Sequence, residues 1–171
     1  MVSSNIDLDI HGYLPTSLID FPGHLAPVVF LSRCTFRCPF CHNPELILDY
    51  ESLEKIDFEN ILLDLNLRKD WISGIVFTGG QPTIYKDLPT AFSEIKNLGV
   101  KVKLDTNGTN PDMIEILLER KLVDYIAMDI KSPLGRYAEV AKISVDPESF
   151  KASINIIMTS GLDYEFRTTV V

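Results

Sequence analysis

The sequence predicts an α/β fold in which a parallel sheet of five strands is covered by helices on the outside. One observation is that short apolar segments alternate with amphipathic ones along the 171 residues, an order typical of strand–helix–strand units with right-handed crossovers. The other is that polar or glycine-rich segments follow four of the expected strands, at the end where such sheets bind ligands. An open doubly wound sheet and an incomplete (β/α) barrel both satisfy these observations.

The first expected strand is the apolar run at 28–31, which ends shortly before a group of cysteines. A helix is expected at 56–67, because its apolar side chains recur at helical spacing and share one face. These side chains are Phe58, Ile61, Leu62 and Leu65. The next strand, at 74–77, is followed by Thr78 and two glycines, which end it.

The second half of the chain repeats this alternation with clearer end signals. The helix expected at 87–98 has Gly99 directly after it, where a glycine commonly ends a helix, and a strand follows at 100–104. Asn110 is a favourable N-cap, and Pro111 is a favourable first residue for the next helix. The remaining expected elements are a strand at 125–128, a short helix at 137–142 within a weakly patterned stretch, a helix that opens at 146–148 and stops at Gly161, and a strand at 164–171.

The bulk properties predict a single cytoplasmic domain. A chain of 171 residues fits one domain with a real core, and we expect that domain to span 1–171 and to lack C-terminal elements, since the chain stops inside a strand. The net charge of −8 provides no basic surface for nucleic acid or an anionic membrane. The N-terminus does not read as a signal peptide, and the longest apolar runs, such as 26–31, are too short to cross a bilayer.

The only three cysteines of the chain, Cys34, Cys38 and Cys41, lie within eight residues in the pattern C-x3-C-x2-C. An odd number of cysteines argues against a disulfide framework. Three thiolates can hold an iron–sulfur cube that normally takes four, which would leave one iron open to another ligand. A zinc site that adds His42 is the alternative. However, the adjacent residues Cys41 and His42 cannot easily both reach one tetrahedral ion, and C-x3-C-x2-C is an unusual spacing for zinc.

Three further segments follow strands and carry polar groups or glycines: Gly79-Gly80-Gln81-Pro82, Asp105-Thr106-Asn107-Gly108 and Asp129-Ile130-Lys131. Each of them alone has an ordinary interpretation, as a strand-ending turn or as a surface Asp/Lys pair. Together, behind the cysteines and at the same end of one sheet, they favour a ligand site.

The order and spacing of these segments resemble the radical S-adenosylmethionine (SAM) superfamily, whose cysteine motif is C-x3-C-x-Φ-C with an aromatic residue at Φ, here Phe40. The resemblance implies that Cys34, Cys38 and Cys41 bind a [4Fe–4S] cluster, that SAM chelates the open iron, and that Phe40 lies beside the adenine. Gly79-Gly80-Gln81-Pro82 resembles the superfamily's GGEP segment, with Gln81 in place of glutamate. The resemblance to the superfamily also favours the incomplete parallel (β/α) barrel, with about five to six strands.

The two later segments resemble the DTNG and D-x-K motifs of the branch that activates glycyl-radical enzymes. The resemblance implies that SAM is held there, and a monovalent cation is a further expectation. The implied SAM-binding residues are Phe40, Gly79, Gly80, Gln81, Asp105, Thr106, Asn107, Asp129, Lys131 and Arg167.

The activity implied by this resemblance is reductive cleavage of SAM to a 5′-deoxyadenosyl radical, which abstracts hydrogen from a glycine of a partner glycyl-radical enzyme. The implied partner is an anaerobic ribonucleotide reductase, with a flavodoxin or ferredoxin as electron donor. Two alternatives stay open: a small-molecule radical enzyme of the 7-carboxy-7-deazaguanine synthase type, and a truncated relative without catalytic activity.

Overall fold

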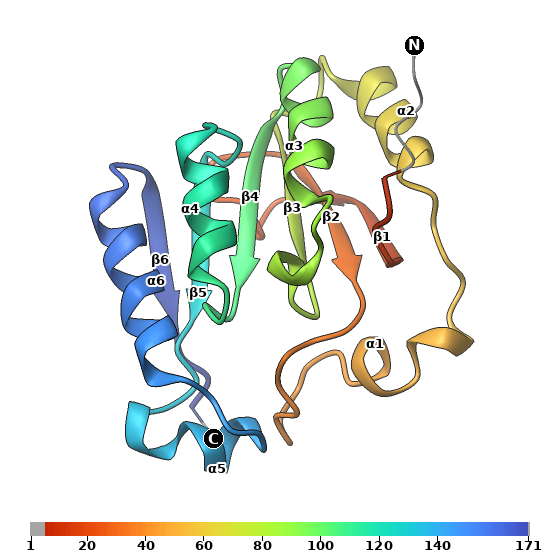
Figure 1. Ribbon diagram of the computed structural model, residues 1–171. Helices are drawn as coiled ribbons and strands as arrows, with labels where there is room; N and C mark the ends of the chain where they lie inside the picture. The colour runs from red at the N-terminus through yellow and green to blue at the C-terminus, as the bar shows by residue number, and fades with distance from the viewer. Residues whose placement is uncertain (1–5, 171) are drawn as a thin grey trace.

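A single six-stranded sheet forms the centre of the computed structural model, which describes residues 6–170. Its strands are β1 (Ile10–Ser17), β2 (Ala26–Leu31), β3 (Gly74–Gly79), β4 (Lys101–Thr106), β5 (Tyr125–Asp129) and β6 (Asp163–Arg167). β1 is antiparallel to β2, and all the other neighbours are parallel. The strands lie in chain order without a reversal (Figure 1). This order excludes the doubly wound alternative and confirms the incomplete (β/α) barrel.

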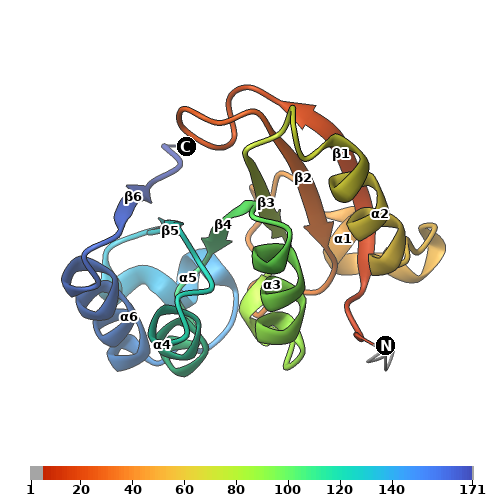
Figure 2. The same ribbon diagram turned by 90° about the horizontal axis from the view of Figure 1, so that it is seen from above.

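The helices are α1 (Glu45–Leu48), α2 (Phe58–Arg68), α3 (Leu88–Asn97), α4 (Pro111–Glu119), α5 (Tyr137–Ala141) and α6 (Pro147–Thr159), with short 3₁₀ turns at Tyr50–Ser52, Pro82–Ile84 and Leu134–Arg136. Helices α2, α3, α4 and α6 lie on one face of the curved sheet (Figure 2). The main core fills the space between the sheet and these helices. Within residues 6–170, no helix combines the length and the apolar character needed to cross a membrane.

Two elements were not predicted, and one strand is shorter than expected. Strand β1 contains Pro15 and is exposed along much of its length, as befits an edge strand, so its sequence lacks a strand pattern. Helix α1 has only four residues, too few to show a helical period. The strand expected at 164–171 ends at Arg167, because β5 beside it ends at Asp129 and offers no backbone to pair with 168–170. Val171 lies outside the described residues.

Asn110 confirms the predicted start of α4 and also links that helix to the turn after β3. Its Oδ1 accepts a hydrogen bond from the Met113 backbone N–H at 3.3 Å, and its Nδ2 donates to the Thr83 carbonyl at 2.6 Å. We expect Asn110→Ala to lower the free energy of unfolding by about 1–2 kcal/mol, as measured by urea denaturation. The matched control is Asp57→Ala, since Asp57 precedes α2 without making a cap hydrogen bond. Equal losses in the two variants would contradict this assignment.

Candidate functional site

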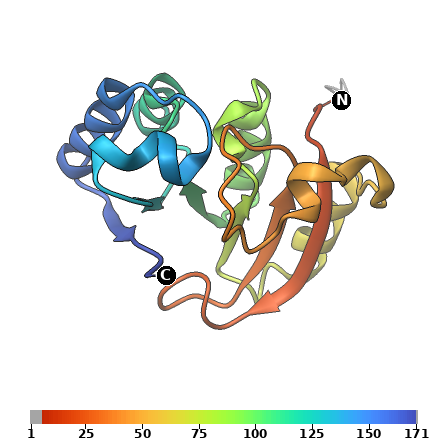
Figure 3. The same cartoon turned by 90° about the horizontal axis from the view of Figure 1, so that it is seen from below.

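A cavity of about 600 Å³ lies at the carboxyl ends of the strands, within the size range of small-molecule sites. Most of its wall is formed by the loop that follows β2 and by residues at or beyond the ends of β3, β4, β5 and β6. Figure 3 shows this loop between α1 and α5 when the molecule is viewed along the strands from their carboxyl ends. The predicted site residues that line the cavity are Cys34, Cys38, Phe40, Cys41, Gly79, Gly80, Asp105, Thr106, Asn107, Asp129, Lys131 and Arg167. Gln81 is the one predicted residue that does not line it.

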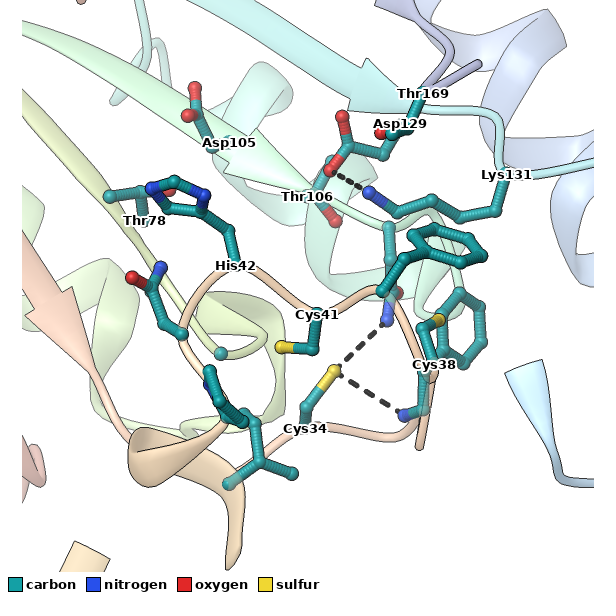
Figure 4. A pocket seen from close by; sticks show the side chains of 18 of the residues that line it. Cys34, Cys38, Cys41, His42, Thr78, Asp105, Thr106, Asp129, Lys131 and Thr169 are labelled. Carbon is teal, nitrogen blue, oxygen red and sulfur yellow. Dashed lines mark hydrogen bonds and ion pairs between the residues drawn. The ribbon is translucent and has the colours of Figure 1, made fainter. Parts of the chain in front are cut away.

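The cysteine loop is fixed to the sheet through its first cysteine. The Cys34 sulfur accepts hydrogen bonds from the Phe36 backbone N–H at 3.3 Å and from Asn107 Nδ2 at 3.7 Å (Figure 4). Because Asn107 directly follows β4, this contact joins the loop after β2 to the loop after β4. A turn joins the other two cysteines, since the Cys41 backbone N–H donates to the Cys38 carbonyl at 3.1 Å.

Partial burial raises the pKa of two of the thiols above its ordinary value. Burial raises the pKa of Cys34, and the hydrogen bond from the Phe36 backbone N–H only partly opposes this. Burial also raises the pKa of Cys38, against the opposing charge of Lys131. Iron binds thiolates, so loading this site must release protons from these sulfurs.

The three thiols suit a cluster better than a single ion. Among residues 6–170, no set of three His, Cys, Asp or Glu side chains lies close enough to hold one metal ion. A four-iron cube is wider than an ion and takes its thiolates from further apart. Three cysteines on one loop, all lining the same cavity, have the donor type that such a cluster takes.

The two glycines at the end of β3 allow this strand to pack against the end of β2. Gly79 has φ +103°, and a Cβ on it would lie 2.5 Å from the Leu31 carbonyl oxygen. A Cβ on Gly80 would overlap the carbonyl oxygen of Arg33 and lie 2.9 Å from that of Ser32. The obstacles are backbone atoms, which cannot rotate away, so both positions require glycine.

We expect Gly80→Ala to lower the free energy of unfolding by about 1–3 kcal/mol through overpacking, and to displace the cysteine loop that begins at Arg33. Urea denaturation measures the first effect, and the iron content after reconstitution measures the second. Gly135→Ala is the control, because a Cβ there meets nothing within 4 Å. Stability and iron content equal to those of the control would show that the collision is relieved elsewhere.

Gln81 is fully buried and lies behind the cavity wall. Its Nε2 donates to Thr83 Oγ1 at 2.6 Å and to Thr106 Oγ1 at 2.8 Å, and its Oε1 accepts from the Asn107 backbone N–H at 2.9 Å. The Asn107 backbone N–H fixes the orientation of the Gln81 side-chain amide. If the amide were flipped, its NH₂ group would face this N–H and no hydrogen bond could form. Gln81 thus joins the ends of β3 and β4, and any effect it has on a ligand is indirect.

Charged side chains from three neighbouring strands meet beside the cysteine loop. Arg167 on β6 forms ion pairs with Asp105 on β4 and Asp129 on β5, each at 3.0 Å. Lys131 pairs with Asp129 at 2.9 Å (Figure 4), and the buried Lys103 pairs with Asp105 at 3.1 Å. Burial by itself lowers the pKa of Arg167, but Asp105 and Asp129 more than reverse this, so the net shift is upward. The guanidinium therefore stays charged.

The cavity also contains residues that the sequence did not single out as site residues. Thr78 and Thr169 lie on its wall (Figure 4), as do Asp20 and Phe36. Thr169 is two residues beyond Arg167, so strand alternation could have indicated it. Asp20 comes from the loop between β1 and β2, and no local pattern connects that loop with the carboxyl ends of the strands.

Comparison with known proteins identifies the family and two curated relatives. Residues 28–171 match the model of the "Radical SAM superfamily". A protein of Methanocaldococcus jannaschii, provisionally named a glycyl-radical enzyme activating enzyme, is 35% identical over 167 residues, covering 95% of this chain and 68% of that protein. A protein of Haemophilus influenzae with the same provisional name is 31% identical over 107 residues, covering 61% of this chain and 40% of that protein.

The fold has a counterpart among solved structures. The crystal structure of Streptococcus suis SuiB bound to the precursor peptide SuiA superposes with a TM-score of 0.62 at 19% identity. The match covers 81% of this chain and 31% of SuiB. At this identity the likeness concerns the fold alone. The chain is also shorter than both curated relatives, and it spans less than half of the second one.

Proposed function

This chain belongs to the radical SAM superfamily, and on that premise we propose that it is an activating enzyme that installs a glycyl radical in a partner enzyme. Members of the superfamily are enzymes that use a [4Fe–4S] cluster and SAM. When bound, these groups supply a 5′-deoxyadenosyl radical that removes a hydrogen atom from the substrate. The contribution of this chain is to bind both groups, orient them and exclude water.

In this proposal the thiolates of Cys34, Cys38 and Cys41 hold the cluster. One iron is then left without a protein ligand and is available to SAM. The cysteines lie on the wall that also contains the polar ends of β4, β5 and β6, so a ligand of the open iron would contact those ends as well.

The rest of the wall would hold SAM through positive side chains, backbone carbonyl oxygens and an aromatic ring. Lys131 and Arg167 provide positive charge for the carboxylate of SAM. The Gly79-Gly80 backbone provides carbonyl oxygens for its amino group, without a side chain that would prevent close approach. Phe40 also lies on the wall and provides an aromatic surface for the adenine.

The observation that carries the proposal is the convergence of three cysteines and four polar strand ends on one cavity, in a chain 35% identical to a provisionally named activating enzyme.

The finer assignments rest on the motifs described in the sequence analysis. We propose an anaerobic ribonucleotide reductase as the partner and a flavodoxin or ferredoxin as the electron donor. We also propose that residues 1–171 form one domain that works in the cytoplasm, where thiols stay reduced and available to iron.

The test is anaerobic incubation of the reconstituted protein with SAM, a low-potential reductant and each glycyl-radical enzyme encoded in the same genome. We expect the doublet EPR signal of a glycyl radical on one of these partners, with 5′-deoxyadenosine formed in equal amount. The control is the same mixture with the Cys41→Ala variant, which should give neither product. Absence of the doublet with every such partner would reject the activase assignment.

The same assay separates the rival functions. Formation of 5′-deoxyadenosine coupled to turnover of a pterin, without any partner protein, would identify an enzyme of the 7-carboxy-7-deazaguanine synthase type. No 5′-deoxyadenosine above background from protein with a complete cluster would identify a relative without catalytic activity.

A further inference from the structure

Arg167 bridges the carboxylates of Asp105 and Asp129, which belong to the two segments where the sequence resemblance implies a monovalent cation. Its Nη1 lies 3.0 Å from Asp105 Oδ2, and its Nε lies 3.0 Å from Asp129 Oδ1. The carboxylates come from the carboxyl-terminal ends of β4 and β5, and Arg167 is the last residue of β6. The guanidinium therefore lies where an ion shared by the two carboxylates would have to bind.

The other oxygens of these carboxylates also face cations of the protein. Asp129 Oδ2 accepts a hydrogen bond from Lys131 Nζ at 2.9 Å, and Asp105 Oδ1 lies 3.1 Å from Lys103 Nζ. Each of the four oxygens thus has a positively charged partner. A bound metal cation needs several oxygen ligands of its own. Although Asp105 Oδ1 accepts no hydrogen bond within the described residues, a cation shared by the two carboxylates would have to compete with these ion pairs for their oxygens.

The group is electrically balanced as it stands. Three basic side chains, Lys103, Lys131 and Arg167, face three acidic ones, Asp105, Asp129 and Glu165; Glu165 Oε1 lies 3.4 Å from Lys103 Nζ. Before SAM binds, an additional ion would add an uncompensated charge to a partly buried place, which is unfavourable.

Gln81 removes a further oxygen ligand, because it changes the hydrogen-bonding role of Thr106. The Thr106 hydroxyl oxygen accepts from Gln81 Nε2 at 2.8 Å and from the Gly108 backbone N–H at 3.1 Å. Both of its lone pairs are used, so the hydroxyl can only donate to another partner. A glutamate at position 81 would accept the hydroxyl hydrogen instead, and would leave Thr106 with a lone pair to offer to a cation.

We propose that Arg167 takes the place of a monovalent cation between Asp105 and Asp129, so that this protein binds SAM without K⁺ or Na⁺. The site as built does not fit the cation that the sequence resemblance implies. Gln81 and Arg167 both disfavour a bound cation. Gln81 uses a lone pair of the Thr106 hydroxyl, and Arg167 occupies the space between the two carboxylates. This inference rests on the proposed function only in assuming that SAM binds in this cavity.

The first experiment compares salts on the wild-type protein. The dissociation constant of SAM is measured anaerobically on the reconstituted protein in KCl, NaCl and choline chloride at equal ionic strength. The thermal unfolding midpoint without SAM is measured in the same salts. We expect both quantities to be the same in the three salts. An affinity about tenfold tighter in K⁺ or Na⁺ than in choline, which is a typical strength of coupling between two ligands, would overturn the proposal.

The two readouts distinguish failure of this inference from failure of the proposed function. Absence of SAM binding in every salt would count against the proposed function, while the unfolding midpoints would still decide whether a cation binds. Midpoints that rise by about 3 °C or more in K⁺ or Na⁺ would overturn the inference even if SAM does not bind.

The second experiment creates cation dependence. Arg167→Gln leaves two carboxylates without the charge between them, and K⁺ or Na⁺ can then enter. We expect SAM affinity of this variant to be weaker than wild type in choline and to recover about tenfold in K⁺ or Na⁺. The double variant Gln81→Glu/Arg167→Gln should recover more, since Thr106 regains a lone pair. The control is Arg136→Gln, an exposed arginine paired with Glu139 outside the cavity.

A purely structural role for Arg167 predicts a different result. The variant would then bind SAM poorly to the same extent in all three salts, and this outcome would overturn the proposal. If Arg167→Gln does not fold, the salt series on the wild-type protein still decides the question.

Discussion

Replacing Cys41 with alanine should abolish assembly of a four-iron cluster and, with it, formation of 5′-deoxyadenosine. Two remaining thiolates cannot hold a cube that normally takes four protein ligands. Cys41 is the best of the three cysteines for this test, because Cys34 and Cys38 also pack against the hydrophobic core. Loss of the cluster in Cys41→Ala can therefore be assigned to the missing ligand. Iron and sulfide content and the EPR spectrum of the reduced protein measure it.

The matched control is His42→Ala, at the next residue. His42 lines the same cavity and is the fourth ligand in the zinc alternative. In the present account His42→Ala retains the four-iron spectrum after reconstitution. Loss of metal in both variants, or stoichiometric zinc in the wild-type protein purified without added iron, would favour the zinc site instead.

Replacing Lys103 with methionine should lower the free energy of unfolding by about 3–5 kcal/mol, the usual cost of removing one partner of a buried ion pair. The side chain of Lys103 is 2% exposed, and its Nζ pairs with Asp105 and Glu165. It also donates a hydrogen bond to the Asp20 carbonyl at 2.6 Å. Oδ1 of Asp105 has no hydrogen-bond partner within residues 6–170, so without Lys103 this buried oxygen would lose its positively charged neighbour.

The matched control is Lys101→Met, two residues earlier on the same strand and on the same face. Lys101 is exposed, and we expect its replacement to change stability by less than about 0.5 kcal/mol. Urea denaturation of the two variants and the wild type gives the comparison. Similar stabilities of Lys103→Met and Lys101→Met would show that the ion pairs of Lys103 do not stabilise the fold.

The sequence predicts best those elements that a local pattern marks, such as an apolar run or a helix cap. The strands at 28–31 and 74–77 are fully apolar runs, and Asn110 with Pro111 marks the start of α4. Strand β1 escaped detection because Pro15 and its exposed positions remove the alternation that predicts a strand.

The candidate site likewise has features that local sequence patterns predict and features that they do not. Cysteine spacing and strand-end motifs are local, and the structure places the predicted site residues on one cavity, apart from Gln81. The role of Gln81 depends on hydrogen bonds to Thr106 and Asn107, more than 20 residues away in the chain. Likewise, nothing local distinguishes the buried Lys103 from the exposed Lys101. Such features depend on which strands become neighbours, and the sequence pattern specifies neighbours less well than it specifies elements.

In the proposed function, Cys34, Cys38 and Cys41 hold a cluster whose open iron binds SAM in the cavity at the carboxyl ends of the strands. The most direct test of this assignment is the EPR spectrum of the reduced, anaerobically reconstituted protein before and after addition of SAM. We expect the signal of a reduced four-iron cluster, with g values that change when SAM is added. A protein that yields no such signal, or one whose signal is the same with and without SAM, would contradict it.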